Sequence, residues 1–172
     1  MKRTIGAVAA LSVLAFAAPA LAQSSASNTA NATALIIRPI TVSSGGTLAF
    51  GTLVRGAGTA VVSTAGVRSV TGAVVALAST TPSAASFTVG GEGGQLVTVS
   101  VGTLTLANIT SGSSADNLPV TLAATNTGSQ TLPGALNTAG SLTVAVGGTV
   151  TLTATTTPGA YSGSFTVTAA YQ

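Results

Sequence analysis

The run that ends the chain constrains the fold more than any other feature. From Tyr161 to Tyr171, apolar or aromatic positions alternate with small, mostly hydroxyl-bearing ones. One face would carry Tyr161, Gly163, Phe165, Val167, Ala169 and Tyr171, and the other Ser162, Ser164, Thr166, Thr168 and Ala170. A period of two is the side-chain period of a β-strand. The run therefore predicts one continuous strand with an inward apolar face.

The same period recurs along most of the chain, and no segment after the N-terminal stretch shows a credible helical period. Short β-branched runs separated by turn residues are typical of a β-sandwich. The sequence thus predicts an all-β domain. The candidate strands are 35–42, 47–54, 59–64, 67–77, a segment around Phe87 and Val89, 96–101 with an extension through Leu104 and Leu106, 118–122, 142–146, 150–152 and 161–171.

Glycine, proline and polar residues predict how these strands are bounded. Pro39 cannot donate to a ladder, so 35–42 belongs at a sheet edge or contains a bulge. Residues 90–94 are predicted to be a flexible connection, and 109–117 and most of 126–140 are predicted to be loops. The pair at 147–148 indicates a hairpin turn, with a bulged continuous strand as the alternative.

The N-terminus has the three-part pattern of a secretory signal peptide. Lys2 and Arg3 precede an apolar stretch at 5–18, and an Ala-Leu-Ala site follows at 20–22. The stretch is shorter than the roughly 20 residues of a spanning helix, and no later segment is apolar enough to cross a bilayer. We therefore expect cleavage before Gln23 and export, with an uncleaved N-terminal anchor as the alternative.

The chain is thus divided into a signal peptide (1–22), an N-terminal extension (23–34) and one β-sandwich domain (35–172). The part after the signal peptide contains Arg38, Arg55, Arg68, Glu92 and Asp116 as its charged residues. Such a sparse, nearly balanced set offers no basic cluster for nucleic acid. There is also no cysteine to form a disulfide. An uncharged surface gives strand edges little protection against association.

The residues that usually carry catalysis are missing. The chain has no His or Cys, and its one Lys lies in the signal peptide. Without a base, the many Ser and Thr hydroxyls are not activated as nucleophiles. Glu92 and Asp116 would have to converge to act as a glycosidase-like pair, so we interpret them as solvated loop charges. We expect no enzyme activity, no metal and no cofactor.

Both ends of the exported part resemble a known family. Residues 146–152 (VGGTVTL) and 158–172 (PGAYSGSFTVTAAYQ) resemble the ending of DUF4402, a bacterial family of secreted domains of unknown function. Residues 36–42 (IIRPITV), followed by 48–53 (LAFGTL), resemble its opening. That family is in turn similar to the spore-coat-U-like pilins of the archaic chaperone–usher pathway.

The resemblance implies an immunoglobulin-like β-sandwich that lacks its last strand. In such pilins a periplasmic chaperone fills the gap first, and the N-terminal extension of the next subunit replaces it, at an outer-membrane usher. Carried over to this chain, the acceptor groove would be formed by Tyr161, Gly163, Phe165, Val167, Ala169, Tyr171, Leu35 and Ile37. The donor segment would present Ala26, Ala30, Ala32 and Ala34.

The expected function is a structural subunit of a fimbria-like filament on the bacterial surface, assembled from copies of this chain or related pilin subunits. The alternative is a self-contained, secreted or outer-surface β-sandwich binding module that does not polymerise. The donor alanines depart from the bulky donor residues of better-known pilins, and small side chains bury little area. The donor is therefore weak, extends into Leu35 and Ile37, or is not used because the domain closes on itself.

Overall fold

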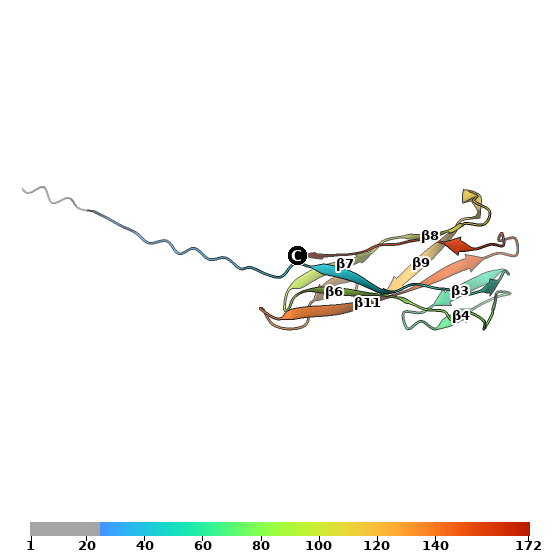
Figure 1. Ribbon diagram of the computed structural model, residues 1–172, viewed down its shortest axis with the longest axis horizontal. Helices are drawn as coiled ribbons and strands as arrows, with labels where there is room; N and C mark the ends of the chain where they lie inside the picture. Colours follow the sequence, from blue (N-terminus) through green and yellow to red (C-terminus); the bar gives the residue numbers. More distant parts are fainter. Residues whose placement is uncertain (1–24) are drawn as a thin grey trace, which may run out of the picture. The chain divides into compact units, whose positions relative to one another are not determined.

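A computed structural model describes residues 25–172 of the chain (Figure 1). The predicted signal peptide at 1–22 and its cleavage site before Gln23 lie outside the described residues. The folded unit is Leu35–Gln172. Residues 25–34, taken by themselves, have no helix or strand, and their side chains are exposed.

The all-β prediction is confirmed, because residues 25–172 contain strands and one 3₁₀ turn (Ser114–Asp116) but no α-helix. The strands are β1 (Thr41–Gly46), β2 (Leu53–Val54), β3 (Gly58–Val62), β4 (Arg68–Val70), β5 (Val75–Ala76), β6 (Ala85–Glu92), β7 (Leu96–Val101), β8 (Leu104–Asn108), β9 (Leu118–Ala124), β10 (Gly128–Thr131), β11 (Ala139–Leu152), β12 (Tyr161–Ser162) and β13 (Val167–Tyr171).

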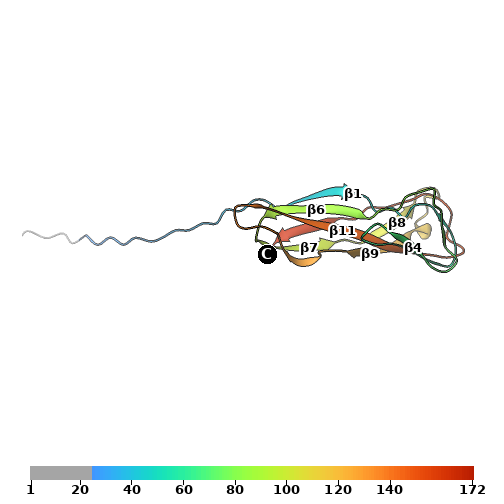
Figure 2. The same cartoon turned by 90° about the horizontal axis from the view of Figure 1, so that it is seen from below.

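The strands form a β-sandwich of antiparallel sheets (Figures 1 and 2). The larger sheet has eight strands, in the order β1-β6-β11-β9-β8-β12 with β3 and β4 attached to β11. The smaller sheet has the order β10-β7-β13, and β2 and β5 form a separate pair. β7 and β8 are consecutive in the chain but belong to different sheets, so Leu104 and Leu106 do not extend β7.

Valine and leucine side chains fill the space between the sheets in two clusters. One lies around β3, β8, β9 and the end of β11, and its members include Ala60, Val62, Leu104, Val120, Val150 and Leu152. The other joins β6, β7 and the start of β11, and its members include Val89, Val97, Val99, Leu132, Val144 and Val146. Leu48, Leu122 and Phe165 pack against both clusters.

β11 is a single long strand, so the hairpin predicted at 147–148 is wrong. Val146 pairs with Ala85 of β6 and Ala124 of β9. Four residues later, Val150 pairs with Ala60 of β3 and Val120 of β9. β6 and β3 therefore follow each other along one edge of β11, while β9 covers the other edge.

The glycine pair marks the point where β11 changes partner. A Cβ on Gly147 would overlap the carbonyl oxygen of Val62, and one on Gly148 would lie 2.9 Å from Val120 Cγ1. Neither position has room for a side chain. The glycines thus serve close strand packing rather than a turn.

Three further predicted boundaries are corrected. Residues 35–40 form no ladder, and the strand begins at Thr41 and runs to Gly46, with a register shift between Ser44 and Gly46. Segment 47–54 contributes only β2 and a bridge between Ala49 and Ser83. The predicted loop 126–140 contains β10, which pairs with β7.

The connection predicted at 90–94 is shorter than expected, because β6 continues through Gly90 and Gly91 to Glu92 and only Gly93 and Gly94 form the turn before β7. Gly90 pairs with Thr41 on one side and Ser141 on the other. A Cβ on Gly91 would lie 2.9 Å from Leu132 Cδ1. As in β11, glycine here allows close packing inside a sheet.

The C-terminal run is divided between two sheets and is not one strand. β12 pairs with β8, whereas β13 pairs with β7. Gly163 lies between them against β8, where a Cβ would come within 2.9 Å of Leu104 Cδ1. The predicted alternation holds except at Gly163, which is exposed: Tyr161, Phe165, Val167, Ala169 and Tyr171 are half-buried, and the positions predicted on the other face are exposed.

Candidate functional site

β13 forms one edge of the smaller sheet, and its backbone is paired on one side only. Gly102 N donates to Thr166 O, and Gln172 N donates to Leu96 O. Hydrogen-bonded positions alternate in an antiparallel ladder, so Thr168 and Ala170 also point toward β7. The N–H and C=O groups of Val167, Ala169 and Tyr171 therefore point away from β7. Within residues 25–172 no backbone group pairs with them.

β1 forms the facing edge, at the end of the larger sheet, and pairs only with β6 among the described strands. β1 and β13 lie beside each other although they belong to different sheets (Figures 1 and 2). We call the outer edges of these two strands the edge pair. Two unpaired edges on neighbouring sheets form a template for a further strand.

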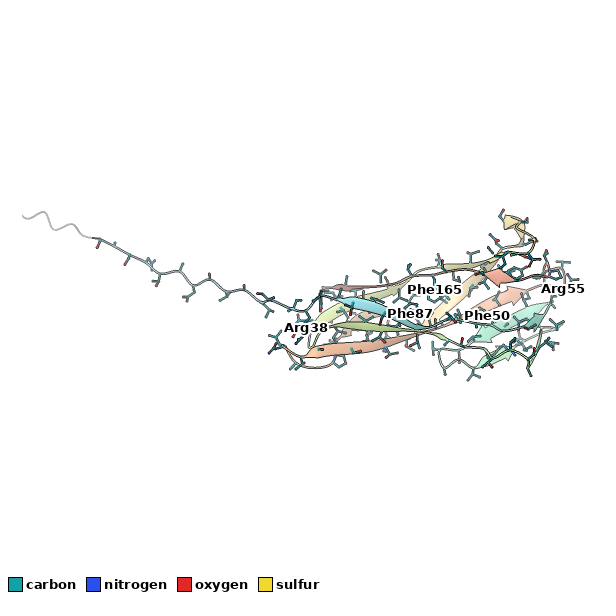
Figure 3. All side chains as sticks on the ribbon, viewed as in Figure 1. Arg38, Phe50, Arg55, Phe87 and Phe165 are labelled. Carbon is teal, nitrogen blue, oxygen red and sulfur yellow. The ribbon has the colours of Figure 1, made fainter. Side chains whose placement is uncertain are left out.

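Apolar side chains lie beneath the edge pair. Phe87 of β6 and Phe165, which precedes β13, meet edge to face with ring centroids 5.8 Å apart (Figure 3). Both rings are only half-buried, as are Val167 and Ala169. Val42 of β1 is 39% exposed. The second core cluster is therefore incompletely covered along this line.

A hollow of about 740 Å³ is lined mainly by two segments of the chain. Residues 48–55 follow β1, and residues 156–161 precede β13. The hollow is lined in part by side chains of the first core cluster, including Phe50, Leu106, Leu118, Val150 and Leu152. Arg55 is at the rim and donates from Nη1 to Thr156 O.

The predicted acceptor residues occupy several different positions. Phe165, Val167, Ala169 and Tyr171 lie along β13 or immediately before it. Tyr161 lines the hollow and donates to Thr157 O, and Gly163 packs against β8.

On the opposite side, the predicted pair Leu35 and Ile37 precedes the strand that forms the facing edge. Leu35 is 66% exposed and Ile37 is half-buried. Ile40, which immediately precedes β1, packs against the second core cluster instead. The predicted donor residues Ala26, Ala30, Ala32 and Ala34 are all exposed.

Glu92 is the residue that sequence reasoning placed wrongly. It was predicted to be solvated, yet it is 2% exposed and lies at the end of β6. Arg38 donates to its Oε2 from Nη1 (2.9 Å) and from its backbone N (3.2 Å), and Asn137 N donates to Oε1. Burial alone would raise the pKa of Glu92, but these hydrogen bonds and the Arg38 charge outweigh it and lower the pKa.

Asp116 is held by different partners at the 3₁₀ turn. Ser111 Oγ donates to its Oδ2 at 2.7 Å, and Thr157 Oγ1 donates to its Oδ1 at 2.5 Å. These hydroxyls lower the pKa of Asp116. Glu92 and Asp116 share no hydrogen-bond partner, and each is a structural carboxylate of its own segment.

The part of the chain that the structure describes holds no group of three or more His, Cys, Asp or Glu that could bind a metal. Among residues 25–172 there is also no helix with the length and apolarity needed to span a bilayer.

The family model described as "Domain of unknown function (DUF4402)" matches residues 40–171. The matched segment begins immediately before β1 and ends with β13, so it contains the whole edge pair. No curated protein and no solved structure matches the chain.

Proposed function

Because this chain belongs to the DUF4402 family, whose function is unknown, we propose its role from its geometry: it is a non-catalytic structural subunit of a fimbria-like filament, assembled by donor-strand complementation. A strand supplied by another copy would lie between β1 and β13. The domain would then be an immunoglobulin-like sandwich completed in trans. Such a contact joins different surfaces of successive copies and propagates as a filament.

One observation carries this proposal. Val167, Ala169 and Tyr171 direct unpaired backbone groups away from β7, and the half-buried Phe87–Phe165 pair lies beneath the same line. An added strand would satisfy the backbone groups with hydrogen bonds and cover the rings with alternate side chains. One extended segment could therefore both pair with the backbone edge and cover the two rings.

The N-terminal extension has the pattern of such a segment. Ala26, Ala30, Ala32 and Ala34 share one phase of a period-two alternation, and Ile36 continues it. Ile36 is 90% exposed, so its side chain is free of contacts within the domain. In this proposal Ile36 supplies the bulk that the alanines lack.

Export is part of the same proposal. The signal peptide at 1–22 would direct the chain to the periplasm, where a chaperone would protect the edge pair. An outer-membrane usher would then carry assembly to the cell surface. These partners rest on the resemblance to pilins and on the need to cover an unpaired edge before assembly.

A second candidate is the self-contained surface binding module. Its support is the hollow of about 740 Å³, which could hold an apolar group of a ligand. The small alanines of the extension favour it as well, because each missing methylene forfeits about 0.8 kcal/mol of burial.

The two candidates differ in what the extension does. We expect the chain that starts at Gln23 to form filaments visible by electron microscopy, and the chain that starts at Leu35 to remain a folded monomer. If both forms are equally stable monomers, the filament proposal is wrong and the module is favoured.

A phase test sharpens this experiment without changing the length of the extension. Ala30→Asp with Ala32→Asp places charges on the face that would turn inward, and should abolish filaments. Thr29→Asp with Asn31→Asp places the same charges on the other face, and should leave filaments intact. Equal effects of the two pairs would argue against strand insertion.

A further inference from the structure

Arg38, Asn137 and Tyr171 surround the buried Glu92 in a polar cluster at one end of the domain, which we call the clamp. Figure 3 places Arg38 at this end and Arg55 at the opposite end. The carboxylate of Glu92 accepts hydrogen bonds from Arg38 and from Asn137 N, and Arg38 Nη2 also donates to Asn137 O at 3.2 Å. The clamp therefore fixes the chain immediately before β1 to the end of β6 and to the turn before β11.

Tyr171 adds the end of β13 to the clamp through one hydroxyl. Glu92 N donates to Tyr171 Oη at 2.7 Å, and Tyr171 Oη donates to Arg38 O at 2.9 Å. This single group thus uses both its donor and one acceptor site. It connects the outer strand of the smaller sheet to the segment that leads into β1.

The Tyr171 side chain spans the space that an added strand would need. Neighbouring strands in a sheet lie about 4.8 Å apart, so an inserted backbone requires room on both sides. At Val167 and Ala169 no described side chain bonds across to β1. At Tyr171 the hydroxyl contacts the backbone of Arg38 directly.

We propose that the clamp closes the Tyr171 end of the edge pair and acts as a stop that sets the register of the incoming strand. This proposal rests on the strand addition proposed above. With the stop in place, the inserted segment cannot slide past Tyr171, and each of its alternate side chains meets a defined position. Small alanines give weak register preference by themselves, so a chain with such a donor needs a fixed end. Tyr171 and Glu92 are positioning residues in this sense.

The clamp itself can be tested without any filament, by hydrogen exchange of the full exported chain. Tyr171→Phe removes the hydroxyl, and we expect the Glu92 amide to exchange about tenfold faster, the factor for one lost hydrogen bond. The amide of Ala170, which pairs with β7, should follow to a smaller extent. Tyr161→Phe is the matched control, because its hydroxyl donates to Thr157 O at the other end. If the two variants leave the Glu92 amide equally protected, no clamp exists.

The stop is tested in the filament by disulfide mapping, which is clean because the chain has no cysteine. Ala169→Cys is combined in turn with a cysteine at each position from 26 to 36. Without a further substitution we expect cross-linking at one position, or at two positions that are two residues apart and share a face. With Tyr171→Phe added, cross-links should spread over several positions.

The possible results separate the two proposals. Identical cross-link patterns with and without Tyr171→Phe would overturn the stop while leaving strand addition intact. No cross-link at any position in either protein would overturn strand addition and the stop together. A spread of register that Tyr161→Phe produces equally would show loss of general stability, and would also overturn the stop.

Discussion

All charged side chains of the folded unit form hydrogen bonds within it. Arg38 binds Glu92, Arg55 donates to Thr156 O, Arg68 donates to Phe50 O and Leu77 O, and Asp116 accepts from Ser111 and Thr157. The charged side chains therefore stabilise loops and strand ends, and they are not spread over the outer faces of the sheets. Edges without Lys or Arg lack the usual barrier to strand pairing. The placement of the charged residues therefore favours association of this domain with another strand.

The two carboxylates predict how stability depends on pH. Both Glu92 and Asp116 have a pKa below the ordinary value, so their contribution is present above the unfolded-state pKa of about 4 and is lost as pH falls through the lower folded-state pKa. Urea unfolding should show a constant free energy from pH 7 to about pH 5 and a decline below about pH 4.

Glu92→Gln should lower the free energy of unfolding at pH 7, because Arg38 loses its charge partner. It should also reduce the acid decline, leaving the part due to Asp116. Asp116→Asn is the control for that remainder. If Glu92→Gln retains the full acid decline of the parent chain, the proposed linkage to Glu92 is wrong.

The position of Glu92 could not be predicted from the sequence. It lies in a glycine-rich stretch that is typical of an exposed turn. Its partners Arg38 and Asn137 are 54 and 45 residues away in the sequence, so no local sequence pattern could predict these contacts. Tyr171 was correctly predicted to face inward, but its hydroxyl partners were equally remote.

At the scale of elements, the alternation predicted most strands and their inward faces. The alternation did not predict that one alternating segment is divided between two sheets, as it is between β12 and β13. The same residues face inward in either sheet, so the pattern does not change where the strand passes from one sheet to the other. It failed in β11 for the opposite reason, since a glycine pair that is typical of a turn lies within one strand. The change from β6 to β3 as a partner depends on segments far apart in the chain.

Gly147→Ala tests the packing role of the pair. The added Cβ would overlap Val62 O, so we expect a loss of about 1–3 kcal/mol in the free energy of unfolding. Gly45→Ala in β1 is the matched control, because its Cβ would have ordinary contacts no closer than 3.8 Å. Equal stability of the two variants in urea would contradict the packing role.

In the whole molecule, the edge pair is formed by strands from the two ends of the folded unit. β1 begins soon after the extension, and β13 ends next to the C-terminus. The resemblance to DUF4402 indicated this region, and Val167, Ala169 and Tyr171 of β13 were correctly predicted to face inward. The identity of the opposite strand was not, since Pro39 delays pairing until Thr41.

Proline substitution in β13 separates assembly from folding. The N–H of Ala169 points toward the unpaired edge, so Ala169→Pro removes no ladder bond of the domain but blocks one from an incoming strand. The N–H of Ala170 points toward β7, so Ala170→Pro removes a ladder bond and should cost about 1 kcal/mol or more in urea unfolding. Ala169→Pro should therefore unfold almost as the parent chain does and yet form no filaments by electron microscopy. Filaments of normal length from a folded Ala169→Pro protein would mean that assembly does not use the β13 edge. The backbone groups of the adjacent alanines face in opposite directions, and that direction is the physical basis of the proposed function.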